Sequence, residues 1–184
     1  YDTATNTVVE AVDKIRDTAS SHNRLFFVEV MGRDSGYIAL KTAIATGAIA
    51  VMTPEANMDI DDLISILGKG EESNKTSSIV IVAEGDKNGG AMEIAAKVHS
   101  RYNKYDTRVT VLGHIQRGGD PSCFDRVLAS RLGVGAVEAL ISGKTAVMAG
   151  MVNDEVVYTP FLEAINRKSK GLDEELRVAQ ILSI

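Results

Sequence analysis

The sequence has no tryptophan, a single cysteine and only three prolines among its 184 residues. The lone Cys123 excludes a disulfide within the chain and weakly favours a reducing compartment. No apolar run approaches the roughly 20 residues that a membrane-spanning helix needs. The net charge is −5, from 25 acidic and 20 basic residues, and no basic tract interrupts the chain. We therefore expect a cytoplasmic protein with no membrane and no nucleic-acid partner.

An initiator methionine and a secretory signal are also absent, since the chain begins at Tyr1. The expectation is a domain fragment or a processed piece rather than a whole gene product. The length suits one α/β domain, or one domain and part of another. Three histidines and one cysteine, widely spaced, do not make a structural zinc site.

What is present is a regular alternation of apolar patterns. Short runs rich in Val, Ile and Phe predict strands, and apolar residues at helical spacing predict helices. The expected strands are 25–31, 48–53, 77–83, 108–112, 145–151 and 155–159, and the expected helices are 3–19, 38–46, 59–67, 91–102, 122–140, 161–166 and 172–182. This order predicts an open α/β fold with a mainly parallel sheet flanked by helices.

Three polar motifs follow three of the expected strands. Met31-Gly32-Arg33 follows the first, Glu84 follows the strand 77–83, and His114 and Arg117 follow the strand 108–112. Ligands of parallel sheets bind beyond the carboxyl ends of the strands, where all three motifs fall. Arginine offers a planar cationic fork for an oxyanion, and histidine a switchable donor or acceptor. The pattern favours a phosphate-ester site.

Each motif also has an ordinary explanation. Met31-Gly32-Arg33 is compatible with a plain strand-to-helix turn, in which Asp34 or Ser35 is a natural helix N-cap. Glu84 is compatible with a solvated carboxylate. Gly68-Lys69-Gly70 is too short for a phosphate loop and predicts a helix end. Asp125-Arg126 predicts a cap or brace for the long helix.

Two longer stretches carry a family resemblance. Val28–Arg33 with Gly36, and Val111–Gly119 with Pro121, Asp125-Arg126 and Ala129-Ser130-Arg131, resemble two signatures of the phosphofructokinase family. The resemblance covers essentially the whole chain and implies a three-layer α/β/α fold. It also implies a fructose-6-phosphate-binding domain over residues 1–160 and a C-terminal helical segment over 161–184.

The family phosphorylates fructose 6-phosphate at its 1-hydroxyl, giving fructose 1,6-bisphosphate in glycolysis. By resemblance, Met31, Gly32 and Arg33 line the sugar-phosphate site, with Arg33 supporting catalysis, and Glu84 binds sugar hydroxyls. His114 and Arg117 hold the 6-phosphate, with Ile115 and Gln116 between them. Arg24 and Arg108 match arginines that reach the 6-phosphate of a neighbouring subunit, which implies a homo-oligomer, in this family a tetramer.

The family's nucleotide-binding half has no counterpart here. A Gly-Gly-Asp loop, a Gly-rich phosphate loop and a Thr-Ile-Asp-Asn-Asp stretch with the catalytic base do not occur. ATP and Mg²⁺ are therefore expected to bind mainly to the missing half, and the chain alone is expected to be inactive. Many bacterial members of this allosteric family place an acidic ligand of an ADP effector site where this chain has Ile49. Arg16 and Lys75 match other residues of that effector site.

The sequence leaves several alternatives open. The donor is expected to be ATP, with pyrophosphate as the alternative. A non-catalytic module that kept the sugar-phosphate pocket is another possibility, and so is a different α/β sugar-phosphate enzyme of the isomerase type.

Overall fold

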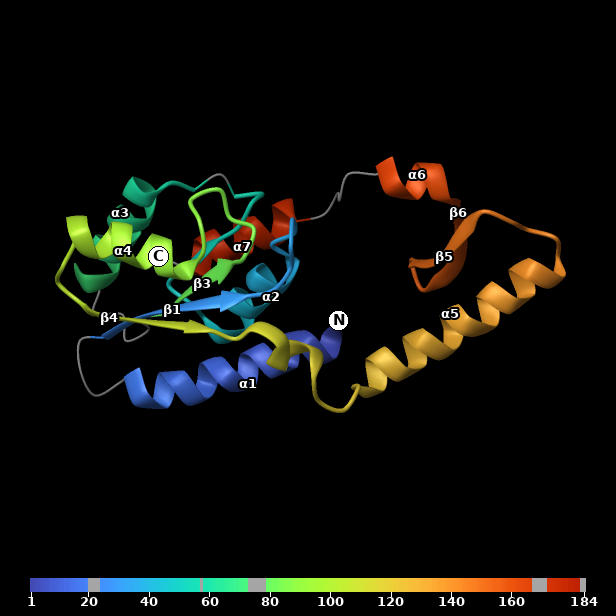
Figure 1. Cartoon of the computed structure of the whole chain (residues 1–184), viewed down its shortest axis with the longest axis horizontal. Coiled ribbons are helices and arrows are strands. Elements are labelled where there is room, and N and C mark those ends of the chain that lie inside the picture. The colour runs from blue at the N-terminus through green and yellow to red at the C-terminus, as the bar shows by residue number, and fades with distance from the viewer. Residues whose placement is uncertain (20–23, 57, 73–78, 167–171, 183–184) are drawn as a thin grey trace. The chain divides into compact units, whose positions relative to one another are not determined.

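The computed structural model describes residues 1–19, 24–56, 58–72, 79–166 and 172–182 (Figure 1). The chain divides into two compact units. Unit 1 comprises Tyr1–Thr3 and Asp120–Lys170, and unit 2 comprises Ala4–Gly119 and Gly171–Ile184. Within the described residues, no helix is both long and apolar enough to cross a membrane.

Unit 2 is built on a four-stranded parallel sheet in the order β2-β3-β1-β4. The strands are β1 (Arg24–Val30), β2 (Ala50–Met52), β3 (Ile79–Ala83) and β4 (Asp106–Val111). Every residue of β3 is buried, and β3 lies between β2 and β1. The expectation of a buried strand here is confirmed for these five residues, whereas 77 and 78 lie outside the described residues.

Helices cover both faces of this sheet (Figure 1). One face packs against α1 (Asp2–Ala19), α2 (Tyr37–Thr46) and α7 (Asp173–Leu182), and the other against α3 (Ile60–Glu72) and α4 (Ala91–Arg101). The alternation of side chains along β1 explains both layers. Phe26 and Val28 join the first apolar cluster, and Leu25 and Phe27 join the second. The predicted three-layer α/β/α fold is confirmed.

Unit 1 contains α5 (Cys123–Ile141), the antiparallel strands β5 (Val147–Val152) and β6 (Glu155–Pro160), and α6 (Phe161–Asn166). Asn153 and Asp154 join the two strands with φ values of 49° and 63°, as a two-residue hairpin turn requires. The two expected short strands are confirmed as this hairpin. The compact units cut the chain elsewhere than at residue 160, and the expected functional domain over 1–160 stays a prediction.

Asp125 braces the start of α1 within unit 1. Its carboxylate accepts hydrogen bonds from the Thr3 hydroxyl at 2.6 Å and the Thr3 backbone N–H at 2.8 Å, and it pairs with the amine of Tyr1 at 2.9 Å. These donors, the Thr3 hydroxyl foremost, hold the pKa of Asp125 well below its ordinary value. Ser122 caps α5 by accepting the Asp125 backbone N–H at 3.2 Å. The prediction that Asp125-Arg126 caps or braces the long helix is wrong for Asp125, whose carboxylate binds Tyr1 and Thr3 instead. Arg126 does brace the start of α5, because its Nε donates to the Pro121 carbonyl at 2.8 Å.

One local expectation is wrong, and a second is confirmed in part. Helix α3 continues through Gly68-Lys69-Gly70 to Glu72, because its apolar face still packs there and Gly70 lies directly against Ile49. Helix α2 begins after Gly36, and Ser35 Oγ accepts the N–H of its first residue, Tyr37, at 3.3 Å, so Ser35 contributes to the start of the helix as expected. The Glu55 carboxylate, from the loop after β2, also accepts the Gly36 N–H at 3.0 Å. A cap supplied from a distant segment leaves no local sequence signal.

Candidate functional site: the carboxyl edge of the sheet

The three expected motifs meet at one edge of the sheet. Met31 directly follows β1, Glu84 follows β3, and the short 3₁₀ helix η1 (Gly113–Arg117) follows β4. Because β1 lies between β3 and β4, all three carboxyl ends are adjacent. The structure therefore brings the motifs together as their place after parallel strands predicted.

Glu84 holds the backbone of the loop that follows β1. Its Oε1 atom accepts the N–H of Gly32 at 3.2 Å and the N–H of Arg33 at 2.7 Å. The Glu84 N–H in turn donates to the Val30 carbonyl at 3.0 Å. Arg33 has a φ of 53°, a left-handed conformation that is uncommon for a residue with a side chain. The ionised carboxylate stabilises this unusual turn, because hydrogen bonds to a charged acceptor are stronger than neutral ones.

Gly85 lets the loop after β3 approach the same turn. A Cβ atom at this position would lie only 2.0 Å from the Arg33 carbonyl oxygen, far inside van der Waals contact. A side chain at residue 85 would therefore displace Arg33 or the loop after β3. A glycine is needed here because it has no side chain, and not because of its backbone conformation.

Gln116 ties the loop after β1 to η1. Its side chain is buried, with 2% of its surface exposed. The side-chain oxygen accepts the Met31 N–H at 3.2 Å, and the side-chain nitrogen donates to the Gly113 carbonyl at 3.1 Å. Both ends of the amide are thus engaged by backbone. Its expected contact with substrate stays a prediction.

Arg33, His114 and Arg117 remain exposed at this edge, and so does Ile115. The fixed backbone thus presents two guanidinium groups and an imidazole on the loops at one sheet edge, together with the Glu84 carboxylate. Guanidinium groups form paired, charge-assisted hydrogen bonds with phosphate oxygens. The arrangement suits a phosphorylated polyol, with cations for the phosphate and a carboxylate for hydroxyl groups.

Arg24 lies at the other end of β1, and Arg108 is the third of the six residues of β4. Arg24 is the first residue of β1 and pairs in register with Asp106, the first residue of β4. Asp106 Oδ2 lies 2.8 Å from Arg108 Nη2 and 3.7 Å from Arg24 Nε. At about 3.3 Å per residue, the length of β1 separates Arg24 from Val30 by about 20 Å. Arg24 therefore lies far from its own chain's candidate site, whereas Arg108 lies three residues, about 10 Å, before Val111 at the end of β4.

Glu29 is a further structural carboxylate that the sequence patterns do not reveal. Its Oε2 atom accepts the Ala91 N–H at 2.7 Å, at the first residue of α4, whose own N-cap Gly90 has no side chain to offer. A negative charge at this place is stabilising, because the N-terminus of a helix carries the positive end of the helix dipole. Glu29, within β1, and Glu55, in the loop after β2, thus each accept a backbone N–H at the start of a helix, α4 and α2 respectively.

The expected effector residues show a different environment. Ile49 is buried, and its N–H donates to the Ile79 carbonyl at 2.9 Å, so this position is part of the apolar core. Arg16 donates to the Thr46 carbonyl. Lys75 lies outside the described residues. The burial of Ile49 agrees with the departure from an acidic effector ligand noted in the sequence.

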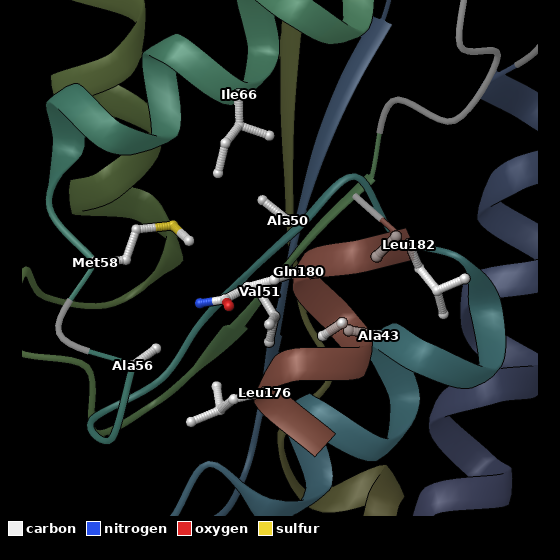
Figure 2. Close-up of a pocket in the computed structure, with 11 residues that line it drawn as sticks. Ala43, Ala50, Val51, Ala56, Met58, Ile66, Leu176, Gln180 and Leu182 are labelled. Atoms are coloured by element: carbon white, nitrogen blue, oxygen red, sulfur yellow. The ribbon is translucent and has the colours of Figure 1, made fainter. Parts of the chain in front are cut away.

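A separate small pocket lies between α2, β2, α3 and α7 (Figure 2). Its volume is about 40 Å³, and its lining is made of alanines, other apolar residues and Gln180. Figure 2 shows Ile66 on the α3 side and Leu176 on the α7 side of this space. No cationic side chain lines it, so it does not fit a sugar phosphate.

An open parallel sheet with cationic side chains beyond its strand ends defines an α/β domain fitted to an anionic ligand. Comparison with known proteins makes this more specific. The sequence model described as Phosphofructokinase matches residues 1–140, which is well over half of the chain. The chain belongs to the phosphofructokinase family.

Two relatives illustrate the match. The chain is 52% identical to ATP-dependent 6-phosphofructokinase 2 of Bacteroides thetaiotaomicron, over 100% of this chain and 56% of the relative. It is 48% identical to ATP-dependent 6-phosphofructokinase 1 of Thermus thermophilus, over 100% of this chain and 57% of the relative. The chain thus spans a little over half the length of these relatives.

Solved structures agree on the fold. The phosphofructokinase of Saccharomyces cerevisiae matches with a TM-score of 0.80 and 30% identity, over 98% of this chain and 25% of the yeast chain. The pyrophosphate-dependent phosphofructokinase of Marinobacter aquaeolei matches with a TM-score of 0.74 over 97% of this chain and 53% of its own. At 20% identity, the second likeness supports the fold alone.

Proposed function

We propose that this chain is part of an ATP-dependent 6-phosphofructokinase and carries its fructose 6-phosphate site. The enzyme would transfer a phosphoryl group to the 1-hydroxyl of fructose 6-phosphate, in glycolysis and in the cytoplasm. One observation carries the proposal. Glu84 and Gln116 fix the three motif segments to one another at the sheet edge, and Arg33, His114 and Arg117 are exposed there.

In this proposal His114 and Arg117 bind the 6-phosphate. Both come from η1, directly after β4, so a rigid strand positions them. Met31 and Gly32 line the sugar, and the second oxygen of Glu84 binds sugar hydroxyls while Oε1 keeps the backbone contacts described above. Arg33 lies on a turn held by Glu84, and its guanidinium would stabilise charge that develops during phosphoryl transfer.

The phosphate of one subunit would also receive Arg24 and Arg108 from a neighbour. The support is that Arg24 lies about 20 Å along β1 from its own site, and that Asp106, the first residue of β4, holds the Arg108 guanidinium toward the amino end of that strand. At that distance Arg24 can serve a sugar phosphate only across a subunit interface, and Arg108 is proposed to act with it. We therefore propose a homo-oligomer, a tetramer as in the family, in which each site is completed by a second copy.

The described residues do not fit the phosphoryl donor. They contain no group of three His, Cys, Asp or Glu side chains that could hold a metal ion, and the family's Thr-Ile-Asp-Asn-Asp stretch does not occur in the sequence. We propose that Mg²⁺ and ATP bind to the part of the polypeptide that lies outside these 184 residues. The names of the relatives support ATP as the donor.

Unit 1 supports the idea of a larger polypeptide. Helix α5 is apolar around much of its circumference, yet among its described residues only Gly135 and Ala139 are buried. Val127, Val134 and Ile141 are exposed and recur every seven residues, so they share one face of the helix. An apolar helix face of this kind is ordinarily covered by another part of a protein.

The test is a chimaera in which these 184 residues replace the matching segment of the Bacteroides thetaiotaomicron relative. The chimaera should phosphorylate fructose 6-phosphate with ATP and Mg²⁺, and the 184-residue chain alone should show only background activity. Calorimetry on the chimaera measures fructose 6-phosphate binding separately from turnover. A chimaera that binds the sugar phosphate without turnover would favour a non-catalytic module, and one that folds but binds none would contradict the proposal.

A further inference from the structure

Gln116 is a neutral side chain buried between two exposed residues that would bind phosphate or line its site. It lies one residue before Arg117 and two after His114, yet only 2% of its surface is exposed. Burying an amide is unfavourable unless its polar atoms find partners. Here they find the Met31 N–H and the Gly113 carbonyl, from two different segments.

These two hydrogen bonds connect the halves of the candidate site. Met31 begins the turn that carries Arg33, and Gly113 begins the 3₁₀ helix that carries His114 and Arg117. Strand pairing places the ends of β1 and β4 side by side, but it stops at Glu29 and Val111. Beyond the last strand bond, from the Leu112 N–H to the Glu29 carbonyl, the Gln116 amide continues the connection.

We propose that Gln116 is a positioning residue. Its amide sets the backbone of Met31–Arg33 against η1, so that Arg33 stands at a fixed place relative to His114 and Arg117. The benefit to ligand binding rests on the function proposed above, whereas the positioning itself does not. Displacements of about 1 Å at such sites can reduce function by up to about a hundredfold. In this proposal Gln116 acts through the backbone, in place of the direct contact with substrate that the family resemblance implies.

The chemistry of the amide makes the proposal specific. The site needs one acceptor, for the Met31 N–H, and one donor, for the Gly113 carbonyl. Leucine has a similar volume and offers neither. A glutamate carboxylate offers only acceptors and would face the Gly113 carbonyl with like partial charge. A protonated glutamate, however, has one acceptor oxygen and one O–H donor, and so reproduces the pattern of the amide.

The experiment compares Gln116→Leu and Gln116→Glu with the unaltered sequence, in the 184-residue chain and in the chimaera. In the 184-residue chain, hydrogen exchange measured by NMR reports whether the Met31 N–H is still protected, and the amides of β3 report whether unit 2 is folded. In the chimaera, calorimetry gives the affinity for fructose 6-phosphate from pH 8 to pH 5.5. Val111→Thr, at an exposed side chain at the end of β4, is the control.

Gln116→Leu should speed exchange of the Met31 N–H and weaken fructose 6-phosphate binding by about tenfold at every pH, well above the effect of the control. Gln116→Glu should bind as weakly at pH 8 but recover toward the unaltered affinity as the pH falls and the carboxyl is protonated. The three proteins differ only at residue 116, so the ratio of their affinities isolates the effect of that side chain. Recovery that is confined to the glutamate variant is a signature that simple loss of packing cannot produce.

Two results would overturn the proposal. One is unchanged exchange of the Met31 N–H in Gln116→Leu while β3 stays protected. The other is a lost Met31 hydrogen bond with affinity still within twofold of the unaltered sequence. If Gln116→Leu does not fold, the pH dependence of Gln116→Glu tests the proposal instead. A ratio of its affinity to the unaltered affinity that does not change with pH would then contradict the proposal. If the unaltered chimaera binds no fructose 6-phosphate, the proposed function fails, and Met31 exchange still tests the positioning.

Discussion

Glu84 Oε1 accepts the backbone N–H of Arg33 at 2.7 Å, so a residue expected to bind sugar also shapes the turn that carries a cation of the site. Arg33 adopts a left-handed φ of 53° there, and the Gly32 N–H shares the same oxygen at 3.2 Å. The two roles of Glu84 are separable by substitution, because an amide oxygen still accepts an N–H and a methyl group does not.

Glu84→Gln should keep the turn and weaken the binding of the sugar. Loss of a charge-assisted hydrogen bond to a hydroxyl costs about 1.5–3 kcal/mol, or one to two decades of affinity. Inorganic phosphate should bind almost unchanged. Glu84→Ala should weaken both ligands, because the backbone of Arg33 is released. Calorimetry with fructose 6-phosphate and with inorganic phosphate on the chimaera separates the cases; equal behaviour of the two variants would contradict the double role.

Gly85→Ala should destabilise the chain. The new Cβ would lie 2.0 Å from the Arg33 carbonyl oxygen, and overpacking of this kind costs about 1–3 kcal/mol. Gly68→Ala is a matched control, because Gly68 lies within α3 and has no atom within 4 Å of the corresponding Cβ position. The control should gain up to about 1 kcal/mol from helix propensity. Urea unfolding measures the stability of both variants. A Gly85→Ala variant as stable as the unaltered chain would show that the turn can shift at little cost.

Asp125 should make stability fall in acid. Its pKa is lowered in the folded chain, first by the Thr3 hydroxyl, so the unfolded chain binds a proton more readily. Its contribution is complete above the ordinary aspartate pKa of about 3.9 and is lost as the pH falls from there toward the lower folded value. Asp125→Asn should flatten this part of the stability curve, whereas Asp120→Asn should not. The check is thermal unfolding from pH 6 to pH 2.5. Identical curves for Asp125→Asn and the unaltered chain would show that Asp125 does not cause the loss of stability in acid.

Arg108 and Arg117 should complement each other across an interface. In the chimaera, Arg108→Ala removes the arginine given to a neighbour, and Arg117→Ala removes the arginine of the local site. At a fructose 6-phosphate concentration that saturates only the unaltered chimaera, each variant alone should show little activity. When the two are unfolded, mixed and reassembled, some sites receive both arginines and activity should return. Hybrids that form, as shown by mass, and still have no activity would contradict a site shared between subunits.

Much of the fold could be predicted from the sequence, because strands and helices of unit 2 carry clear apolar periods. The buried run Ile79–Ala83 and the helix end at Gly47, which has a left-handed φ of 60°, are local signals of that kind. Once the strands were predicted, the positions of the motifs could be predicted too, because residues that follow parallel strands lie at one edge of the sheet. The contribution of Ser35 to the start of α2 could be predicted, but that of Glu55 could not, because Glu55 lies 19 residues from Gly36.

The hydrogen bonds that hold the loops of the site together could not be predicted from the sequence either. Gln116 bonds to Met31, which lies 85 residues away, and Glu84 bonds to Arg33 over 51 residues. A glutamine in a His-Ile-Gln-Arg stretch has the same local pattern whether its amide faces the ligand or the backbone. Burial decides between these, and burial depends on how β1, β3 and β4 are ordered in the sheet.

The most direct test of the account is the affinity of the chimaera for fructose 6-phosphate when Arg117 is replaced. Arg117→Ala should lose about 1.5–3 kcal/mol, or one to two decades of affinity, because one charge-assisted phosphate contact is removed. Arg117→Lys should recover only part of this loss, since lysine keeps the charge but not the planar fork. If Arg117→Ala stays within about twofold of the unaltered affinity, well under 1 kcal/mol, η1 does not bind the phosphate and the proposed site is wrong.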